Sequence, residues 1–143
     1  MKEQRKKVIS SAGLYAGTLL KWVALAGLIG LASGLLGTVF HVGVEIATEL
    51  RGANAWLLWL LPVAGLVIVA IYRLTHTEGQ GTNDIFDQVH QGSHISLLLL
   101  PAIFCGTILT HLCGGSAGRE GAALQMGGAI GFHTGRLFHL DDR

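Results

Sequence analysis

The stretch GGSAGREGAALQ, residues 114–125, decides which fold this sequence predicts. It places Arg119, Glu120 and four glycines between hydrophobic segments, where charged residues are costly. Glycines before a helix leave backbone N–H groups accessible, and the first four N–H groups of a helix have no intrahelical partner. Together with the helix dipole, the turn predicts an anion-binding helix start formed by Gly118, Arg119 and Gly121.

Glu120 lies at the mouth of this predicted site. Its carboxylate would occupy the place of the anion by accepting the same N–H groups. Protonation removes the charge, so the side chain would swing away and admit the ion. A glutamate in this place is both a gate and a proton acceptor. The alternative interpretation is that Glu120 only caps the helix and pairs with Arg119.

The composition outside this stretch is typical of a membrane protein. Of the 143 residues, 50% are hydrophobic and 13% are charged, and the mean hydropathy is +0.52. An average soluble domain has about 25% charged residues. The net charge is +1, but Lys2, Arg5, Lys6 and Lys7 cluster at the start. We expect these cations to hold the N-terminus in the cytoplasm rather than to bind nucleic acid.

The order of apolar segments predicts an all-α integral membrane protein of the cell membrane that crosses it several times. We expect a basic N-terminal segment at 1–20, a transmembrane domain at 21–140 and a polar end at 141–143. Within the domain, we expect helices at 19–46, 55–72, 83–91, 95–113 and 120–138. The helix at 83–91 is too short to span a bilayer. Polar residues at 49–54 predict the first turn, and Pro62 predicts a kink in the second span.

Glycines recur at helical spacing in the first and last predicted helices. Gly30 and Gly34 form a GxxxG pair, and Gly127, Gly131 and Gly135 follow one another every four residues. Such spacing lets helix backbones approach closely in membranes. These faces are therefore predicted to pack against other helices.

The motif itself resembles that of a known family. Gly118-Arg119-Glu120-Gly121, preceded by Gly115-Ser116 and followed by Gln125, resembles the gating-glutamate motif GREGP or GKEGP of the CLC chloride channels and proton-coupled antiporters. Ala122 stands where most members have proline, which favours a first helical turn without being required there.

The resemblance implies the N-terminal half of the CLC inverted-repeat fold, with tilted and half-length helices. Only the first repeat is covered. It further implies that the chain works with a halide ion, protons and the lipid bilayer, and that the complete protein is a homodimer. Anion transport across the membrane, gated by Glu120, is the function that follows.

A second turn bears on which halide moves. In most of the family a Gly-Ser-Gly-Ile-Pro turn contacts the ion, whereas residues 79–86 here read GQGTNDIF, without the serine and the proline. Gly81-Thr82-Asn83 and the following Asp87-Gln88-Val89-His90 resemble the fluoride-transporting branch. The resemblance therefore places Gly81, Thr82 and Asn83 at the anion and favours proton-coupled fluoride over chloride movement. Channel and exchanger both stay open.

Other classes of function are less well supported by the residues. His90 and His94 have the spacing of a helical metal pair, but Gly92 and Ser93 separate them and no third ligand is evident. A phosphate-binding loop would need a Gly-Lys-Ser or Gly-Lys-Thr ending, which is absent. We expect neither a metal nor a cofactor, and no enzymatic activity.

The remaining alternative is a truncated or degenerate CLC fragment that only packs in the membrane. The second repeat of the family supplies another helix N-terminus and a tyrosine that faces the ion, and neither lies within these residues. We expect the chain to be part of a longer protein, in preference to two copies that replace the second repeat.

Overall fold

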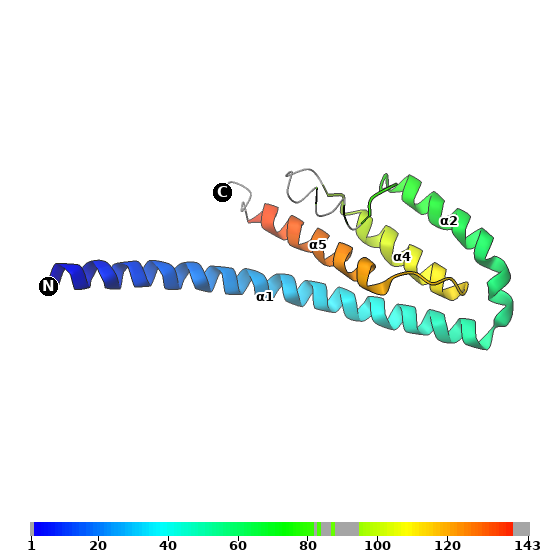
Figure 1. The fold of residues 1–143 in the computed structure, drawn as a ribbon, viewed down its shortest axis with the longest axis horizontal. Coiled ribbons are helices and arrows are strands. Elements are labelled where there is room, and N and C mark those ends of the chain that lie inside the picture. The colour runs from blue at the N-terminus through cyan, green and yellow to red at the C-terminus, as the bar shows by residue number, and fades with distance from the viewer. Residues whose placement is uncertain (1, 82, 84–86, 88–94, 139–143) are drawn as a thin grey trace.

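The computed structural model describes residues 2–81, 83, 87 and 95–138, with side chains from residue 15 onward. These residues form helices and connecting turns and contain no strand. Within these described residues, four α-helices and one 3-10 helix follow one another (Figure 1). Their order is α1 (Lys2–Ala53), η1 (Ala55–Leu60), α2 (Leu61–Leu74), α4 (Leu99–Leu112) and α5 (Arg119–Leu137).

Helix α1 is longer than the first predicted span. It has 52 residues, and its N-terminal part projects beyond the other helices (Figure 1). At about 1.5 Å per residue such a helix is longer than the roughly 30 Å of a hydrocarbon core. The predicted turn at 49–54 is wrong, because residues 49–53 form the last helical turn and the chain bends at Asn54. Glutamate, leucine and arginine favour the helical conformation. The sequence becomes more polar at these residues, but the helix continues through them.

The second predicted span consists of two elements. The 3-10 helix η1 leads from Asn54 into α2, and Pro62 occupies the first turn of α2. The predicted kink is therefore wrong: a first-turn N–H has no intrahelical acceptor, so proline causes no loss there.

Helix α4 is the centre of the fold, because it packs against α1, α2 and α5. It begins at Leu99, four residues later than predicted, and the preceding Ile95 is fully buried outside the helix. The core joins Ile95 to residues of α1, α4 and α5: Phe40, Val44, Leu99, Ile103, Ala122, Met126 and Ala129.

Two glycines that the sequence did not single out allow this packing. A Cβ on Gly43 of α1 would lie 2.8 Å from Ile108 Cδ1 of α4, and one on Gly106 would lie 3.4 Å from the ring of Tyr72. At Gly30, Gly34, Gly127, Gly131 and Gly135, by contrast, nothing lies within 4 Å of an added Cβ. Contacts between the described helices therefore do not use the predicted glycine faces.

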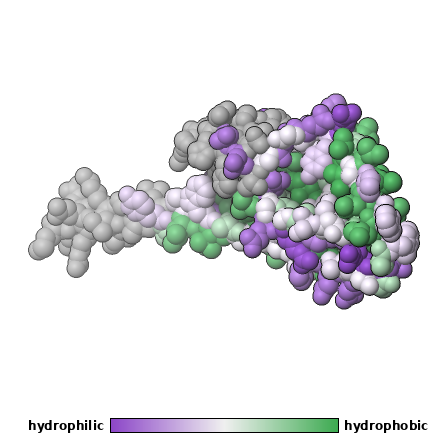
Figure 2. Space-filling view, turned by 45° about the vertical axis from the view of Figure 1, so that its right-hand side comes forward, coloured by the Kyte–Doolittle hydropathy of each residue, from purple (hydrophilic) through white to green (hydrophobic). Residues whose placement is uncertain are grey.

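Large apolar side chains cover much of the surface. Leu31, Leu35, Leu66 and Val67 are all exposed, and Figure 2 shows extended apolar patches. Two helical stretches, Tyr15–Ala53 and Ala55–Leu74, are long and apolar enough to cross a membrane, and Leu99–Leu112 is a shorter apolar helix. Such a surface is unfavourable in water and suits a bilayer.

The neighbouring leucines at the start of α4 test this packing. Leu99 is fully buried, whereas Leu98 is 53% exposed. We expect Leu99→Ala to lower the free energy of unfolding by about 2 kcal/mol, near the low end of the range for buried leucines, because lipid is as apolar as the core. Leu98→Ala should change it by less than about 0.5 kcal/mol. Unfolding of the full-length protein in detergent measures both, and equal losses would contradict the packing.

Candidate functional site

The start of α5 has the geometry that the sequence predicts, within one residue of the expected boundary. Gly118 is the N-cap, with φ −68° and ψ 110°, and no side chain caps the helix. The N–H of Ala122 donates to the Gly118 carbonyl oxygen at 3.3 Å. The preceding N–H groups, those of Arg119, Glu120 and Gly121, come before the first intrahelical bond and have no acceptor within the helix. Gly118, Arg119 and Glu120 are exposed residues, and Gly121 is half-buried.

Glu120 lies in the first turn of α5, beside these N–H groups. Among the described residues, the one ion pair joins Arg73 and Glu78, so Glu120 does not pair with Arg119. Arg119 instead turns towards α4, where its Nε lies 3.5 Å from Nε2 of His111. The carboxylate of Glu120 is thus left to face the surroundings of the helix start.

His111 is a residue of this site to which sequence reasoning gave no role. Its Nδ1 lies 2.8 Å from the carbonyl oxygen of Thr107, one turn earlier in α4. A carbonyl only accepts, so Nδ1 carries the hydrogen and Nε2 presents a lone pair to Arg119. His111 and Arg119 are eight residues apart and lie on either side of a turn. Helical periodicity does not extend across a turn, so the sequence could not predict their contact.

The turn between α4 and α5 is built on two glycines. Gly114 has φ +84°, and the N–H groups of Gly114 and Gly115 donate to the carbonyl oxygens of His111 and Thr110, at 3.1 and 2.8 Å. These bonds satisfy the end of α4, as a left-handed glycine after a helix commonly does. The turn therefore ends α4 sharply and redirects the chain.

The end of α1 and the helix η1 close over this turn. A Cβ on Gly114 would lie 2.9 Å from Arg51 Nε and 3.1 Å from Leu58 Cδ1. A Cβ on Gly115 would lie 2.7 Å from Thr110 Cγ2. The chain then runs back alongside the bundle, so that α5 begins set back from the end of α4 instead of beyond it (Figure 1).

The second predicted turn follows α2 and has a well-bonded base. Thr77 is fully buried, its N–H donates to the Tyr72 carbonyl oxygen at 3.0 Å, and its hydroxyl lies 2.7 Å from that of Thr75. Gly79 follows with φ +73°. These bonds fix the course of the chain up to Gly81.

Two of the three predicted anion-binding residues in this turn are described. Gly81 is half-buried, and Asn83 is helical and exposed, as is Asp87 further along. Thr82 and most of the predicted helix 83–91, including His90, lie outside the described residues, as does His94. This turn precedes α4 in the chain, and the motif at 118–121 follows α4.

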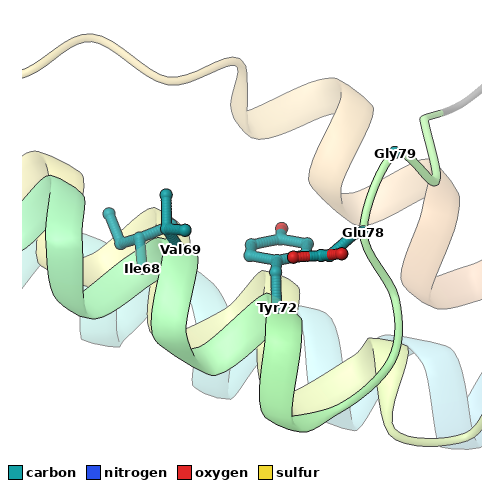
Figure 3. A pocket seen from close by; sticks show the side chains of 5 residues that line it. All are labelled: Ile68, Val69, Tyr72, Glu78 and Gly79. Carbon is teal, nitrogen blue, oxygen red and sulfur yellow. The ribbon is translucent and has the colours of Figure 1, made fainter.

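A cavity of about 240 Å³ lies beside the second turn. It is lined by Ile68, Val69, Tyr72, Glu78 and Gly79, and Figure 3 shows the Glu78 carboxylate beside the Tyr72 ring. Glu78 accepts from Arg73 Nε at 2.9 Å. A carboxylate in the lining is unfavourable for an anion, so the cavity is not the predicted anion site. Among the described residues no group of three or more His, Cys, Asp or Glu could hold a metal ion.

Comparison with known proteins gives a family match. The family described as voltage gated chloride channel matches residues 64–143. A chloride/fluoride channel protein of Pseudomonas syringae pv. tomato is 40% identical over 124 residues, which are 85% of this chain and 27% of that protein. An H(+)/Cl(-) exchange transporter of Vibrio vulnificus is 29% identical over 155 residues, covering 96% of this chain and 32% of that protein.

An uncharacterised protein of Methanocaldococcus jannaschii is 26% identical over 142 residues, 95% of this chain and 33% of that protein. The chain thus spans about a quarter to a third of the length of these relatives. No solved structure matches it. The family match, together with the apolar helices, confirms the predicted all-α membrane fold.

Gly114 provides a test of the turn before α5. Gly114→Ala should destabilise the full-length protein by about 1–2 kcal/mol, because alanine is strained at positive φ and its Cβ meets Arg51. The matched control is Gly65→Ala in α2, where nothing lies within 4 Å of the added Cβ. It should be neutral or stabilising by up to about 1 kcal/mol. Thermal unfolding in detergent compares them, and a Gly114→Ala variant as stable as Gly65→Ala would refute the described turn.

Proposed function

The chain belongs to the voltage-gated chloride channel family, and we propose that it forms one wall of a halide pathway through the membrane, with Glu120 as gate and proton acceptor. The observation that carries the proposal is the start of α5. Three successive backbone N–H groups lack intrahelical acceptors there, the N-cap is an exposed glycine, and a glutamate stands in the first turn. An anion that has lost its water needs such hydrogen-bond donors in place of the water. Backbone N–H groups carry no full positive charge, so they do not bind the anion too tightly for it to leave.

The set-back position of α5 supports the same conclusion. A helix start at the end of a hairpin would lie at the membrane surface, where water already solvates anions. The start of α5 is instead drawn back along the bundle by the turn at Gly114 (Figure 1). A less polar surrounding at this place in the full-length protein would strengthen the attraction of the N–H groups and the helix dipole for an anion.

Gating by Glu120 follows from competition for the same donors. In its ionised form the carboxylate binds at the helix start and excludes the halide. When a proton neutralises the carboxylate, its affinity for the N–H groups falls and the halide takes its place. Each exchange of carboxylate for halide is thereby linked to a proton, which provides coupling to protons or to pH.

Fluoride is the halide that we favour. The 40% identical relative is named a chloride/fluoride channel protein. In this chain the turn at Gly81, Thr82 and Asn83 replaces the usual serine turn, and an amide side chain with backbone N–H groups offers compact donors. Fluoride is hydrated more strongly than chloride. Binding of dehydrated fluoride therefore requires hydrogen-bond donors that can approach it closely, more than it requires a large site.

The proposal concerns the full-length protein, because residues 118–120 are exposed in this chain and an anion pathway must be enclosed on all sides. We propose that this protein is a homodimer in the cell membrane, that its N-terminus is cytoplasmic, and that α1 and α2 cross the bilayer as a hairpin. The alternative role, a packing subunit without transport, predicts no flux.

Glu120 is tested by efflux from proteoliposomes that contain the full-length protein. We expect Glu120→Gln to abolish proton coupling while halide still moves, because glutamine imitates the protonated gate. The matched control is Glu45→Gln on an exposed face of α1, which should leave flux and coupling unchanged. Coupling that is intact in Glu120→Gln would rule out the gating role, and no flux from the unmodified protein would rule out transport.

Asn83 is tested by the ratio of fluoride to chloride efflux in the same vesicles. Asn83→Ala removes a compact donor, and we expect the ratio to fall by about tenfold, the effect of losing roughly 1.4 kcal/mol of preferential stabilisation. Glu45→Gln, on an exposed face of α1, is again the control and should leave the ratio unchanged. A ratio that is unchanged in Asn83→Ala would remove this turn from the account of selectivity.

A further inference from the structure

We infer that Arg51, at the end of α1, is a positioning residue for the anion site: it holds the turn from which the chain runs to the start of α5. This inference rests on the proposed function and goes beyond it, because Arg51 lies far from the motif in sequence.

The contacts of Arg51 point to this turn. Arg51 is the basic residue in the last turn of α1, and its side chain is half-buried. Its Nε and one terminal guanidinium nitrogen would lie 2.9 and 3.3 Å from a Cβ placed on Gly114. A side chain at position 114 would collide with the guanidinium, so the glycine allows Arg51 to lie against this turn.

The charge of Arg51 suits this place. Gly114 directly follows the end of α4, where the helix dipole has its negative end. Among the described residues Arg51 makes no ion pair, and its buried Nε has no hydrogen-bond partner. The negative end of the α4 dipole favours a cation at this place, although a buried donor without an acceptor costs free energy. Arg51 thus attaches the end of α1 to the end of α4.

The consequence for the anion site follows from chain connectivity. Only Gly115, Ser116 and Ala117 separate Gly114 from the N-cap Gly118. Any shift of Gly114 is passed to the N–H groups of residues 119–121 over these few residues. An anion held by several N–H groups requires all of them to point at one place, so a loosened turn weakens binding before it affects the rest of the transport cycle.

The test compares variants of the full-length protein in proteoliposomes. Arg51→Met keeps the length and removes the charge, and Arg51→Lys keeps the charge. Arg136→Met is the matched control, because Arg136 is an exposed arginine in the last turn of α5. We expect Arg51→Met to raise the half-saturating fluoride concentration about fivefold with a smaller change in maximal rate. Arg51→Lys should recover most of this loss, and Arg136→Met should match the unmodified protein.

Hydrogen exchange in detergent provides a second readout that does not depend on transport. Amide exchange of the peptide 113–121 should be faster in Arg51→Met than in Arg136→Met, and Arg51→Lys should lie near the unmodified protein. If the unmodified protein moves no anion, the proposed function fails, whereas the exchange rates still decide the role of Arg51. Equal exchange in Arg51→Met and Arg136→Met, or an unchanged half-saturating concentration, would overturn the inference.

Discussion

The free backbone N–H groups at the start of α5 are the constraint on which the rest of this structure depends. A helix start attracts anions wherever it occurs, but in a membrane protein it must be reached by the ion and closed to uncontrolled leakage. An exposed Gly118 leaves the helix start open, and in the proposed function Glu120 is the internal anion that takes the place of the halide. The fold holds the start of α5, with these two residues, set back from the end of α4 (Figure 1).

The place of this helix start is set by α4 and by the turn that ends it. Helix α4 packs against α1, α2 and α5, so its end is a fixed point of the bundle. The positive φ of Gly114 turns the chain back, and Arg51 and Leu58 close over the glycine from outside. The position of the start of α5 therefore depends on residues of α1 and η1 that are more than 50 residues away from Glu120 in the chain.

The start of α5 could be predicted from neighbouring residues alone, because glycines followed by charged residues indicate where a helix begins. Helix α5 starts within one residue of its predicted place. The turn predicted at 49–54 was wrong because polar residues do not end a helix by themselves, and α1 continues to Ala53. The kink predicted at Pro62 was wrong because proline in the first turn of a helix does not bend it. The contacts of His111 with Arg119 and of Arg51 with Gly114 could not be predicted. Each of these contacts forms only when the helices pack, and the sequence contains no periodic pattern that indicates it.

The central claim is that the carboxylate of Glu120 and the halide compete for the N–H groups of α5. Calorimetric titration of the full-length protein with fluoride, in buffers of different ionisation enthalpy, measures how many protons are taken up for each anion bound. The account predicts uptake of about one proton per fluoride in the unmodified protein and none in Glu120→Gln, because glutamine has no carboxylate to neutralise. Equal proton uptake in the two proteins would contradict it.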